Sequence, residues 1–298
     1  MTTESKNETR PSYIKRIEMV DPEKQLTDAL VKKFGKRFSD YREQYFRILN
    51  NSKHGYDFVP DYPLNVLVEV VNKCNLECIM CLSSHRKGPT KVISNEMISK
   101  LFNEFKENNM PALMFGAGDE PLMFSDIDKM WDAARASGIM DIFIFTNGTY
   151  LNEEMRKKIL DHEVSRVYVS LDAATEETYA KIRLNNKNIE EQAAGNNKLK
   201  VIKEDKNKLQ AIEENIKKLV ELRNERKLEL PQIRISFAVQ HRNKHEIELF
   251  KKKWVDVVDF IEFQQTMNID FDKLSKLSEE ERWRRRKPLF KNNYVKDC

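Results

Sequence analysis

The chain has 298 residues, of which 40% are hydrophobic and 34% are charged, which is enough for the core of one large domain or two ordinary ones. Its net charge is only +4 with both signs interspersed, and this argues against a dedicated nucleic-acid binder. No apolar run reaches the roughly 18 residues of a membrane span, and the polar N-terminus lacks a secretory signal. We therefore expect a cytoplasmic protein, in which clustered cysteines act as metal ligands or catalysts rather than disulfides.

Residues 1–62 predict an N-terminal helical extension. Asp21 can cap a first helix, Pro22 suits its first turn, and Gly35 can end it. A second helix is predicted over residues 39–49, and turn-forming residues close the extension near position 63.

The hydrophobic pattern of residues 63–270 predicts short apolar strands that alternate with amphipathic helices. The strands are expected at 66–71, 113–115, 142–145, 167–171, 233–239 and 260–263. Six such units imply an α/β fold with a parallel sheet and right-handed crossovers. A sheet of this kind either stays open, with helices on both faces, or curls toward a barrel.

Three further stretches complete the organisation. Residues 184–227 are charged and indicate an insertion or a solvated helix, whose later part has the spacing of a packed helix. Asn243 and Glu246 predict a capping box at the start of another helix. Residues 271–298 form a separate C-terminal segment with helix-spaced opposite charges.

Cys74, Cys78 and Cys81 fall within eight residues in the pattern C-x3-C-x2-C. Three thiolates in one loop can bind a soft metal centre at three corners. In one interpretation they hold three irons of a 4Fe-4S cluster, and the fourth iron is open to a molecule with an amine and a carboxylate. In the other, zinc takes these cysteines and His85, as in a zinc-binding interaction protein. Zinc fingers use two separated ligand pairs, and the missing second pair favours the cluster.

The residues that leave the predicted strands are polar and rich in glycine, at the sheet edge where α/β proteins bind ligands. After the second strand, Gly116 and Gly118 allow close approach of a ligand, and Glu120 supplies an anion for a cationic amine. After the third strand, Asn147 in a "TNG" turn offers both a donor and an acceptor.

After the fourth strand, Ser170 and Asp172 are expected to project to the same side, by the period of two. Asp172 suits ribose hydroxyls, and Ser170 with Arg183 on the next helix suits a carboxylate. Each of these patterns alone is more often structural, but the set in this order behind the three cysteines is specific.

With these motifs the chain resembles the radical S-adenosylmethionine (SAM) enzymes. The resemblance covers residues 63–270 and includes the cysteine loop, Gly118-Asp119-Glu120-Pro121, "TNGT" and "SLDAAT…Y…IR". It implies a partial (β/α)6 TIM-like barrel, a 4Fe-4S cluster on the three cysteines, and SAM on the open iron. It also implies an external electron donor such as flavodoxin or ferredoxin, and a 5′-deoxyadenosyl radical that abstracts hydrogen from a substrate.

Carried over by position, the resemblance assigns Gly118, Asp119 and Glu120 to the amino end of SAM, Ser170 and Arg183 to its carboxylate, and Asp172 to its ribose. The chain departs from the family at two positions. Asp119 replaces the second glycine of the loop, and Met80 stands where many members have an aromatic residue.

The sequences of these motifs resemble those of the radical SAM branch that has a C-terminal SPASM or twitch extension. That extension normally carries cysteines for auxiliary clusters. Here the sequence stops at Cys298, so we expect that extension to be missing or truncated. Cys298 is then a remnant of it, a terminal thiol, or a ligand shared with a partner chain.

The substrate is expected over the barrel mouth, near the later strand ends. We favour a sugar or another small molecule, and the alternative is a peptide, as in maturases of sulfatases or of ribosomally made peptides. The candidate residues around it are Gln240, His241, Glu262, Gln264 and Gln265. None is assigned as catalytic, because radical hydrogen abstraction needs no protein base.

Overall fold

The computed structural model describes residues 14–18, 21–51, 58–81, 83–85, 88–185, 193–194, 197–198 and 209–265. The predictions for Cys298, for residues 271–298 and for most of the 184–208 stretch therefore lie outside the described residues. Within the described ranges, no helix has the length and apolar character needed to cross a membrane.

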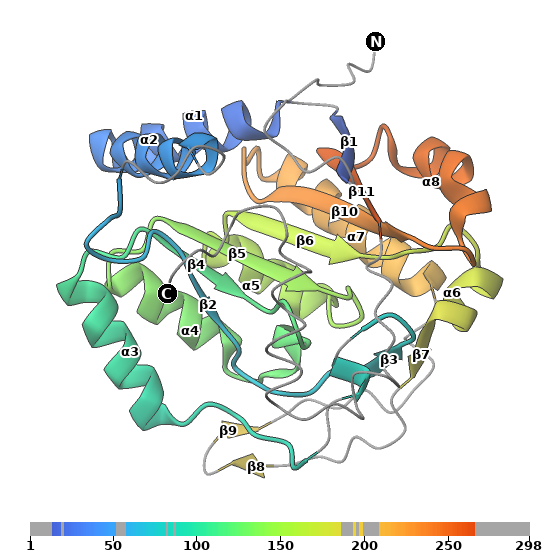
Figure 1. Cartoon of the computed structure of the whole chain (residues 1–298), viewed down its shortest axis with the longest axis horizontal. Helices are drawn as coiled ribbons and strands as arrows, with labels where there is room; N and C mark the ends of the chain where they lie inside the picture. Colours follow the sequence, from blue (N-terminus) through green and yellow to red (C-terminus); the bar gives the residue numbers. More distant parts are fainter. Residues whose placement is uncertain are drawn as a thin grey trace.

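Six parallel strands form the centre of the molecule (Figure 1). They are β2 (Val66–Val68), β4 (Ala112–Phe115), β5 (Asp141–Thr146), β6 (Arg166–Ser170), β10 (Gln232–Val239) and β11 (Phe260–Gln265). Each pairs in parallel with the next, in that order. All six were predicted, and their sequential order requires crossovers of one hand that place the helices on one face.

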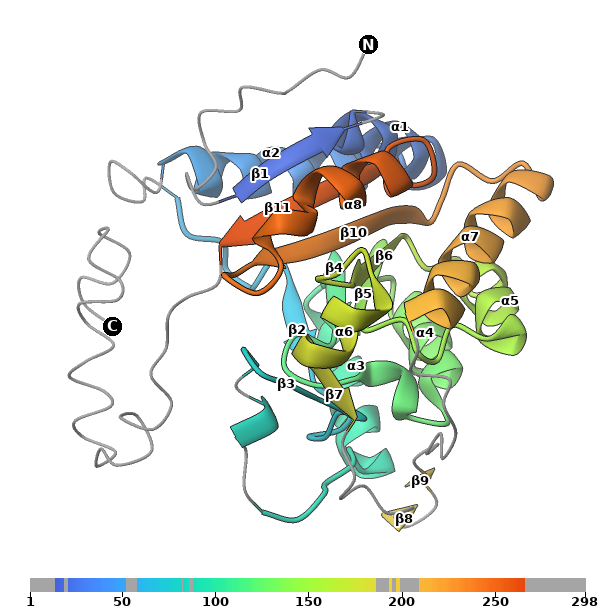
Figure 2. The same ribbon diagram turned by 90° about the vertical axis from the view of Figure 1, so that its right-hand side faces the viewer.

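The sheet is thus a partial, unclosed TIM-like barrel, as predicted. A seventh strand, β1 (Ile14–Glu18), pairs antiparallel with β11 at one edge, and β2 is the other edge. Figure 2 shows β1 beside β11. This strand was not predicted.

The helices follow the strands in alternation. They are α3 (Asn95–Glu107), α4 (Ile127–Ala136), α5 (Glu153–Asp161), α6 (Glu176–Ile182), α7 (Leu209–Glu225) and α8 (Ile247–Trp254). Short 3-10 turns lie at η1 (Ser83–His85), η2 (Pro121–Met123) and η3 (Lys244–Glu246). Ser94, Asn152 and Thr175 cap α3, α5 and α6 by accepting backbone N–H groups. Their apolar faces and the sheet enclose the main core.

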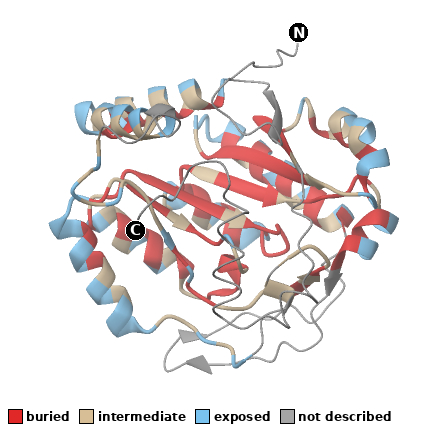
Figure 3. Ribbon diagram, in the orientation of Figure 1, coloured by how far each residue is buried: buried red, intermediate tan, exposed pale blue. Residues whose placement is uncertain are grey.

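Both faces of β4, β5, β6, β10 and β11 are largely buried (Figure 3), whereas Leu67 of the edge strand β2 is exposed. On the face away from the helices, Phe143, Tyr168 and Phe260 form a separate cluster inside the barrel. The same interior holds Arg234, whose guanidinium lies 2.5 Å from the carboxylate of Glu262 and 3.9 Å from the ring centre of Tyr168. Strands buried on both faces are nearly continuous apolar runs, and this made them visible in the sequence.

The N-terminal helices α1 (Pro22–Phe34) and α2 (Lys36–Asn51) cover the amino end of the barrel. Asp21 caps α1 and Gly35 ends it at φ 60°, as predicted. Apolar side chains of both helices, including Leu26 and Phe38, pack against Ala112 and Met140, which lie at the starts of β4 and β5. The extension therefore closes the end opposite to the ligand-binding edge of the strands.

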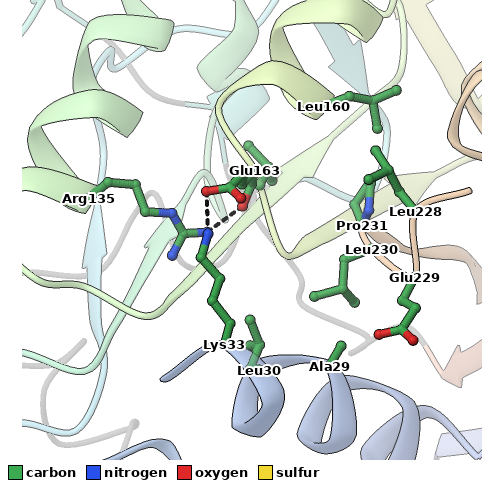
Figure 4. A pocket seen from close by; sticks show the side chains of 11 residues that line it. Ala29, Leu30, Lys33, Arg135, Leu160, Glu163, Leu228, Glu229, Leu230 and Pro231 are labelled. Atoms are coloured by element: carbon green, nitrogen blue, oxygen red, sulfur yellow. Dashed lines mark hydrogen bonds and ion pairs between the residues drawn. The ribbon is translucent and has the colours of Figure 1, made fainter. Parts of the chain in front are cut away.

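A cavity of about 150 Å³ lies between α1 and the barrel wall (Figure 4). Lys33 of α1 pairs with the carboxylate of Glu163, and Arg135 of α4 donates to the Glu163 carbonyl. Mostly apolar side chains line the rest, together with Glu229, whose carboxylate lies 3.8 Å from Lys32. Because its charges are paired and it sits at the amino end, this cavity belongs to the seam between extension and barrel.

Candidate cofactor site

The cysteine loop follows β2 and is joined to the segment after α6. Cys78 ends the short strand β3 (Leu76–Cys78), which pairs antiparallel with β7 (Arg183–Asn185), so that Cys78 lies opposite Arg183. The Ile79 N–H donates to the Ile182 carbonyl at 3.0 Å. Figure 2 shows β3 and β7 side by side. This ladder brings together two motifs that are about a hundred residues apart in the sequence.

The three cysteines form no disulfide with any described residue; Cys78 is buried, and Cys74 and Cys81 are half-buried. Burial raises the pKa of the Cys74 thiol well above its ordinary value. Burial also raises the pKa of Cys78 to about 11, and the positive charge of Arg183 opposes this shift. These two metal-free thiols are therefore protonated at neutral pH, and a metal centre would bind them with release of protons.

Two N–H groups point at the Cys74 sulfur. The backbone N–H of Leu76 lies 3.4 Å from Sγ, and the side-chain amide of Asn147 lies 3.5 Å from it. The Asn147 amide also donates to Oδ1 of Asn75 at 2.8 Å, and Asn75 donates to the Thr149 hydroxyl at 3.0 Å. The "TNG" turn after β5 thus lies directly against the cysteine loop.

Glu120, placed by sequence among the cofactor-binding residues, is 1% exposed and lies under the same turn. Its carboxylate accepts from the Leu122 N–H at 3.2 Å, the Thr146 hydroxyl at 2.7 Å and the Asn147 N–H at 2.7 Å. Burial raises the pKa of Glu120 to about 7, although these three donors favour the anion.

The loop before Glu120 requires a glycine at position 116 because the chain's own atoms leave no room for a side chain there. Gly116 has φ +72°, and a Cβ there would lie 2.6 Å from Cδ of Pro121 and 2.7 Å from the Phe145 carbonyl. The close approach is thus to the chain, whereas the sequence suggested close approach to a ligand. Gly118 and Asp119 are half-buried, and the Ser83 hydroxyl beside the cysteines donates to the Asp119 carboxylate.

The segment after β6 differs from the prediction. The strand ends at Ser170 and Asp172 has φ +61°, so the extended backbone that the period-of-two prediction assumed does not reach Asp172. Asp172 accepts from Arg183 at 3.1 and 2.5 Å and from the Ala238 N–H at 2.7 Å. The Ser170 hydroxyl instead lies 3.3 Å from that of Ser236. Arg183 is therefore held by Asp172, and the Ser170 hydroxyl lies against β10.

Tyr179 is a site residue to which the sequence interpretation gave no role. It lies one helical turn before Arg183, is 2% exposed, and its hydroxyl has no hydrogen-bond partner among the described residues. Burial raises its pKa, and the charges of Arg183, Cys78 and Asp172 also act on it. Its signal in the sequence was the tyrosine of the "T…Y…IR" motif.

These residues fit an anionic, sulfur-ligated group. Such a group would bind the three thiols and accept from the two N–H donors at Cys74. Its negative charge would also suit the Arg183 guanidinium beside Cys78 and the Tyr179 hydroxyl. Within the described side chains, which do not include that of His85, no three acidic, Cys or His groups converge as ligands of a single ion. A 4Fe-4S cluster does not need its ligands to converge on one ion, because each thiolate would bind a different iron.

The loop after β10 is shaped by Asn243, which is buried. Its side chain accepts from the Gln240 N–H at 2.8 Å and donates to the carbonyls of Asp172 and Ala238, each at 2.9 Å. It does not cap the next helix, so the predicted capping box is wrong. The Glu246 carboxylate instead accepts from backbone and hydroxyl groups at the start of α6.

The substrate-side candidates are dispersed. Gln240 is half-buried and His241 is exposed on the loop after β10. Glu262 faces the barrel interior, where it pairs with Arg234 and accepts from Gln264 at 2.8 Å. The side chain of Gln265 lies outside the described residues.

Several known proteins are similar to parts of this chain. A probable GTP 3′,8-cyclase of Methanococcus maripaludis is 32% identical over 119 residues, which are 39% of this chain and 38% of the relative. A 7,8-dihydro-6-hydroxymethylpterin dimethyltransferase of Methanocaldococcus jannaschii is 31% identical over 38% of this chain and 23% of its own. A mycofactocin maturase of Mycobacterium ulcerans is 28% identical over 46% and 36%. The matched part thus spans well under two thirds of each relative.

The fold is also found in solved structures. A histidine-tagged anSMEcpe with bound AdoMet aligns with 69% of this chain and 52% of its own, at 18% identity and a TM-score of 0.50. The family model described as the Radical SAM superfamily matches residues 68–230, which is more than half of the 298 residues. The chain is therefore a member of the radical SAM superfamily, the enzymes that use a 4Fe-4S cluster together with SAM.

Proposed function

We propose that Cys74, Cys78 and Cys81 each bind one iron of the 4Fe-4S cluster, and that SAM binds the remaining iron at the carboxyl end of the barrel. The observation that carries this proposal is the β3–β7 ladder, in which Cys78 lies opposite Arg183. It holds the cluster loop against the segment that the family resemblance assigns to SAM. When bound, the cofactor pair supplies reductive cleavage of SAM to a 5′-deoxyadenosyl radical that abstracts hydrogen from the substrate.

The chain's own residues are proposed to bind SAM and to orient it. Gly118, Asp119 and Glu120 are proposed to meet the amino end of SAM, and the buried Glu120 fixes the turn beneath it through Asn147. Ser170, half-buried at the end of β6, remains the candidate for the SAM carboxylate together with Arg183.

The role proposed for Asp172 changes. Its two carboxylate oxygens already accept three N–H bonds, and the side chain is 1% exposed. A ribose hydroxyl would have to share the buried carboxylate with Arg183 and the Ala238 N–H. We therefore assign Asp172 to holding Arg183 in place and to tying β6 to β10.

The substrate is proposed to be a small molecule bound over the barrel mouth, in the cytoplasm, with electrons from a flavodoxin or ferredoxin. Aromatic side chains and the Arg234–Glu262 pair fill the barrel interior, which leaves the mouth as the place for a substrate. The GTP 3′,8-cyclases among the relatives support a nucleotide-like or sugar substrate. A peptide is the second candidate for the substrate, together with membership of a SPASM-type branch. The mycofactocin maturase among the relatives supports it.

The central experiment is anaerobic purification, reconstitution with iron and sulfide, and addition of dithionite and SAM. We expect a brown protein that forms 5′-deoxyadenosine, and Cys78→Ala should lose both the cluster and the product. His85→Ala is the matched control and should keep both. A colourless protein that holds zinc, loses it in His85→Ala and forms no 5′-deoxyadenosine would overturn the proposal.

The substrate class is tested in the same assay. Pools of nucleotides, sugars or peptides are added separately, and a true substrate should increase 5′-deoxyadenosine above the level formed without one. A response to peptides alone would favour the second candidate.

A further inference from the structure

Building on the proposed cluster, we propose that Asn147 is a positioning residue that holds Cys74 and raises the reduction potential of the cluster. Its side-chain amide donates to the Cys74 sulfur at 3.5 Å, across 73 positions of sequence. From the sequence, Asn147 was predicted only to offer a donor and an acceptor to the cofactor in the turn after β5, with no role at a cysteine.

The orientation of the Asn147 amide is fixed by its partners. The backbone N–H of Thr149 can only donate, and it lies 3.0 Å from one amide atom of Asn147, which must therefore be the oxygen. The Thr149 hydroxyl lies 2.6 Å from the same oxygen. The NH2 group consequently faces Cys74 and the Asn75 oxygen, so it is a donor toward sulfur.

The donor is also held rigidly before any metal binds. Asn75, Asn147 and Thr149 are all buried and satisfy one another. The Asn147 backbone N–H is bound in turn to Glu120 at 2.7 Å. Residues from the cysteine loop, the loop after β4 and the turn after β5 thus form one network. Buried networks that are fully satisfied keep a single geometry.

A donor of this kind acts on the cluster's charge. Reduction adds one negative charge that is shared by the sulfur ligands, and an N–H directed at a thiolate stabilises the more negative state. The second N–H at Cys74 belongs to the backbone of Leu76, so substitution cannot remove it. Among the described residues, Asn147 is a side chain that donates to the Cys74 sulfur and can be replaced.

The test is Asn147→Ala in the full chain, loaded with iron and sulfide and titrated with dithionite while the EPR signal of the reduced cluster is followed. We expect the equilibrium constant for reduction to fall on the order of tenfold, which is about 59 mV for one electron. Asn152→Ala is the matched control. It removes the cap of α5, where Asn152 accepts from Met155, and should leave the potential unchanged.

Asn147→Asp gives a second measurement, because it keeps the size and the oxygen that Thr149 binds but replaces the donor with an acceptor. It should lower the potential further than Asn147→Ala. An unchanged potential in either loaded variant would overturn the inference. So would variants whose apoprotein is already unfolded by circular dichroism, since Asn147 would then serve the fold. Folded variants that lose iron would support its role in holding Cys74.

Failure of this inference is distinguishable from failure of the proposed function. If the unmodified chain binds no cluster, the proposed function falls. If the unmodified chain loads and forms 5′-deoxyadenosine while the variants keep its potential, only the role of Asn147 is rejected.

Discussion

At the scale of single residues, Glu120 combines full burial with three hydrogen-bond donors. These donors stabilise its anion, but burial outweighs them and raises its pKa from 4.5 to about 7. The folded protein therefore keeps a proton that the unfolded chain releases above about pH 4.5. A carboxyl of this kind makes stability depend on pH near neutrality.

The first prediction follows from the sign of this linkage. The stabilisation by protonated Glu120 is complete below about pH 4.5 and is lost as the pH rises through about 7, a change of roughly 3 kcal/mol. Urea unfolding of the metal-free protein at pH 5 and pH 8 measures it. Glu120→Gln should flatten this part of the profile, and parallel profiles for the two proteins would contradict the shift.

Tyr179 gives a second prediction at this scale. Its hydroxyl has no partner within the described residues, and a buried hydroxyl of this kind costs about 1–3 kcal/mol. Tyr179→Phe should therefore stabilise the metal-free protein by about 1 kcal/mol. The gain should shrink once the cluster is loaded, if the hydroxyl then finds an acceptor. Urea midpoints of both forms, measured without oxygen, check this. A metal-free variant that is less stable than the parent would show that the hydroxyl already has a partner.

At the scale of elements, the N-terminal helices pack closely against the amino end of the barrel. Phe38 of α2 is 0% exposed and packs with residues at the amino ends of β4 and β5. Phe38→Ala should lower the free energy of unfolding by about 3–5 kcal/mol. Leu49→Ala on the same helix, where the side chain is 43% exposed, is the control and should change stability by less than about 1 kcal/mol. Equal small effects in urea unfolding would mean that the extension packs only loosely.

The elements that could be predicted are those whose pattern is local. Strands buried on both faces are apolar runs, and α1 has Asp21 and Gly35 at its ends. The strand β1 was missed because this five-residue edge strand, IKRIE, has three charged residues and no apolar run, and only its pairing with β11 defines it. Glu246 was misassigned because its true partners, Thr175 and Thr178, are about seventy residues away.

At the scale of the whole molecule, the barrel interior contains the buried ion pair between Arg234 and Glu262. Arg234 and Glu262 lie on neighbouring strands, and the aromatic rings around Arg234 leave little water to replace a lost partner. Glu262→Ala should therefore destabilise the protein by about 3–5 kcal/mol.

The double variant Arg234→Met with Glu262→Met tests the cause. It removes both charges and should recover most of the loss, because a matched apolar pair avoids an unpaired buried charge. Thermal unfolding of the two variants and the parent decides. A double variant as unstable as Glu262→Ala would show that the shape of the pair, not its charge, is what matters.

The composition of the site could be predicted, but its internal pairing could not. The order of motifs along the strands placed Cys74, Glu120 and Asn147 at one edge of the sheet. The partner of each side chain depends on single backbone angles. Asp172 has a left-handed φ, and this turned it toward Arg183. Period-two reasoning has no means to anticipate such a residue.

The ladder between β3 and β7 has a consequence for engineering. A cysteine loop grafted from a relative would arrive without its strand partner, and a register slip of one residue would turn Cys78 to the opposite face. Transplants should therefore move residues 74–81 and 182–185 as one cassette. Natural exchange between members of the superfamily faces the same constraint, so these two distant stretches are expected to vary together.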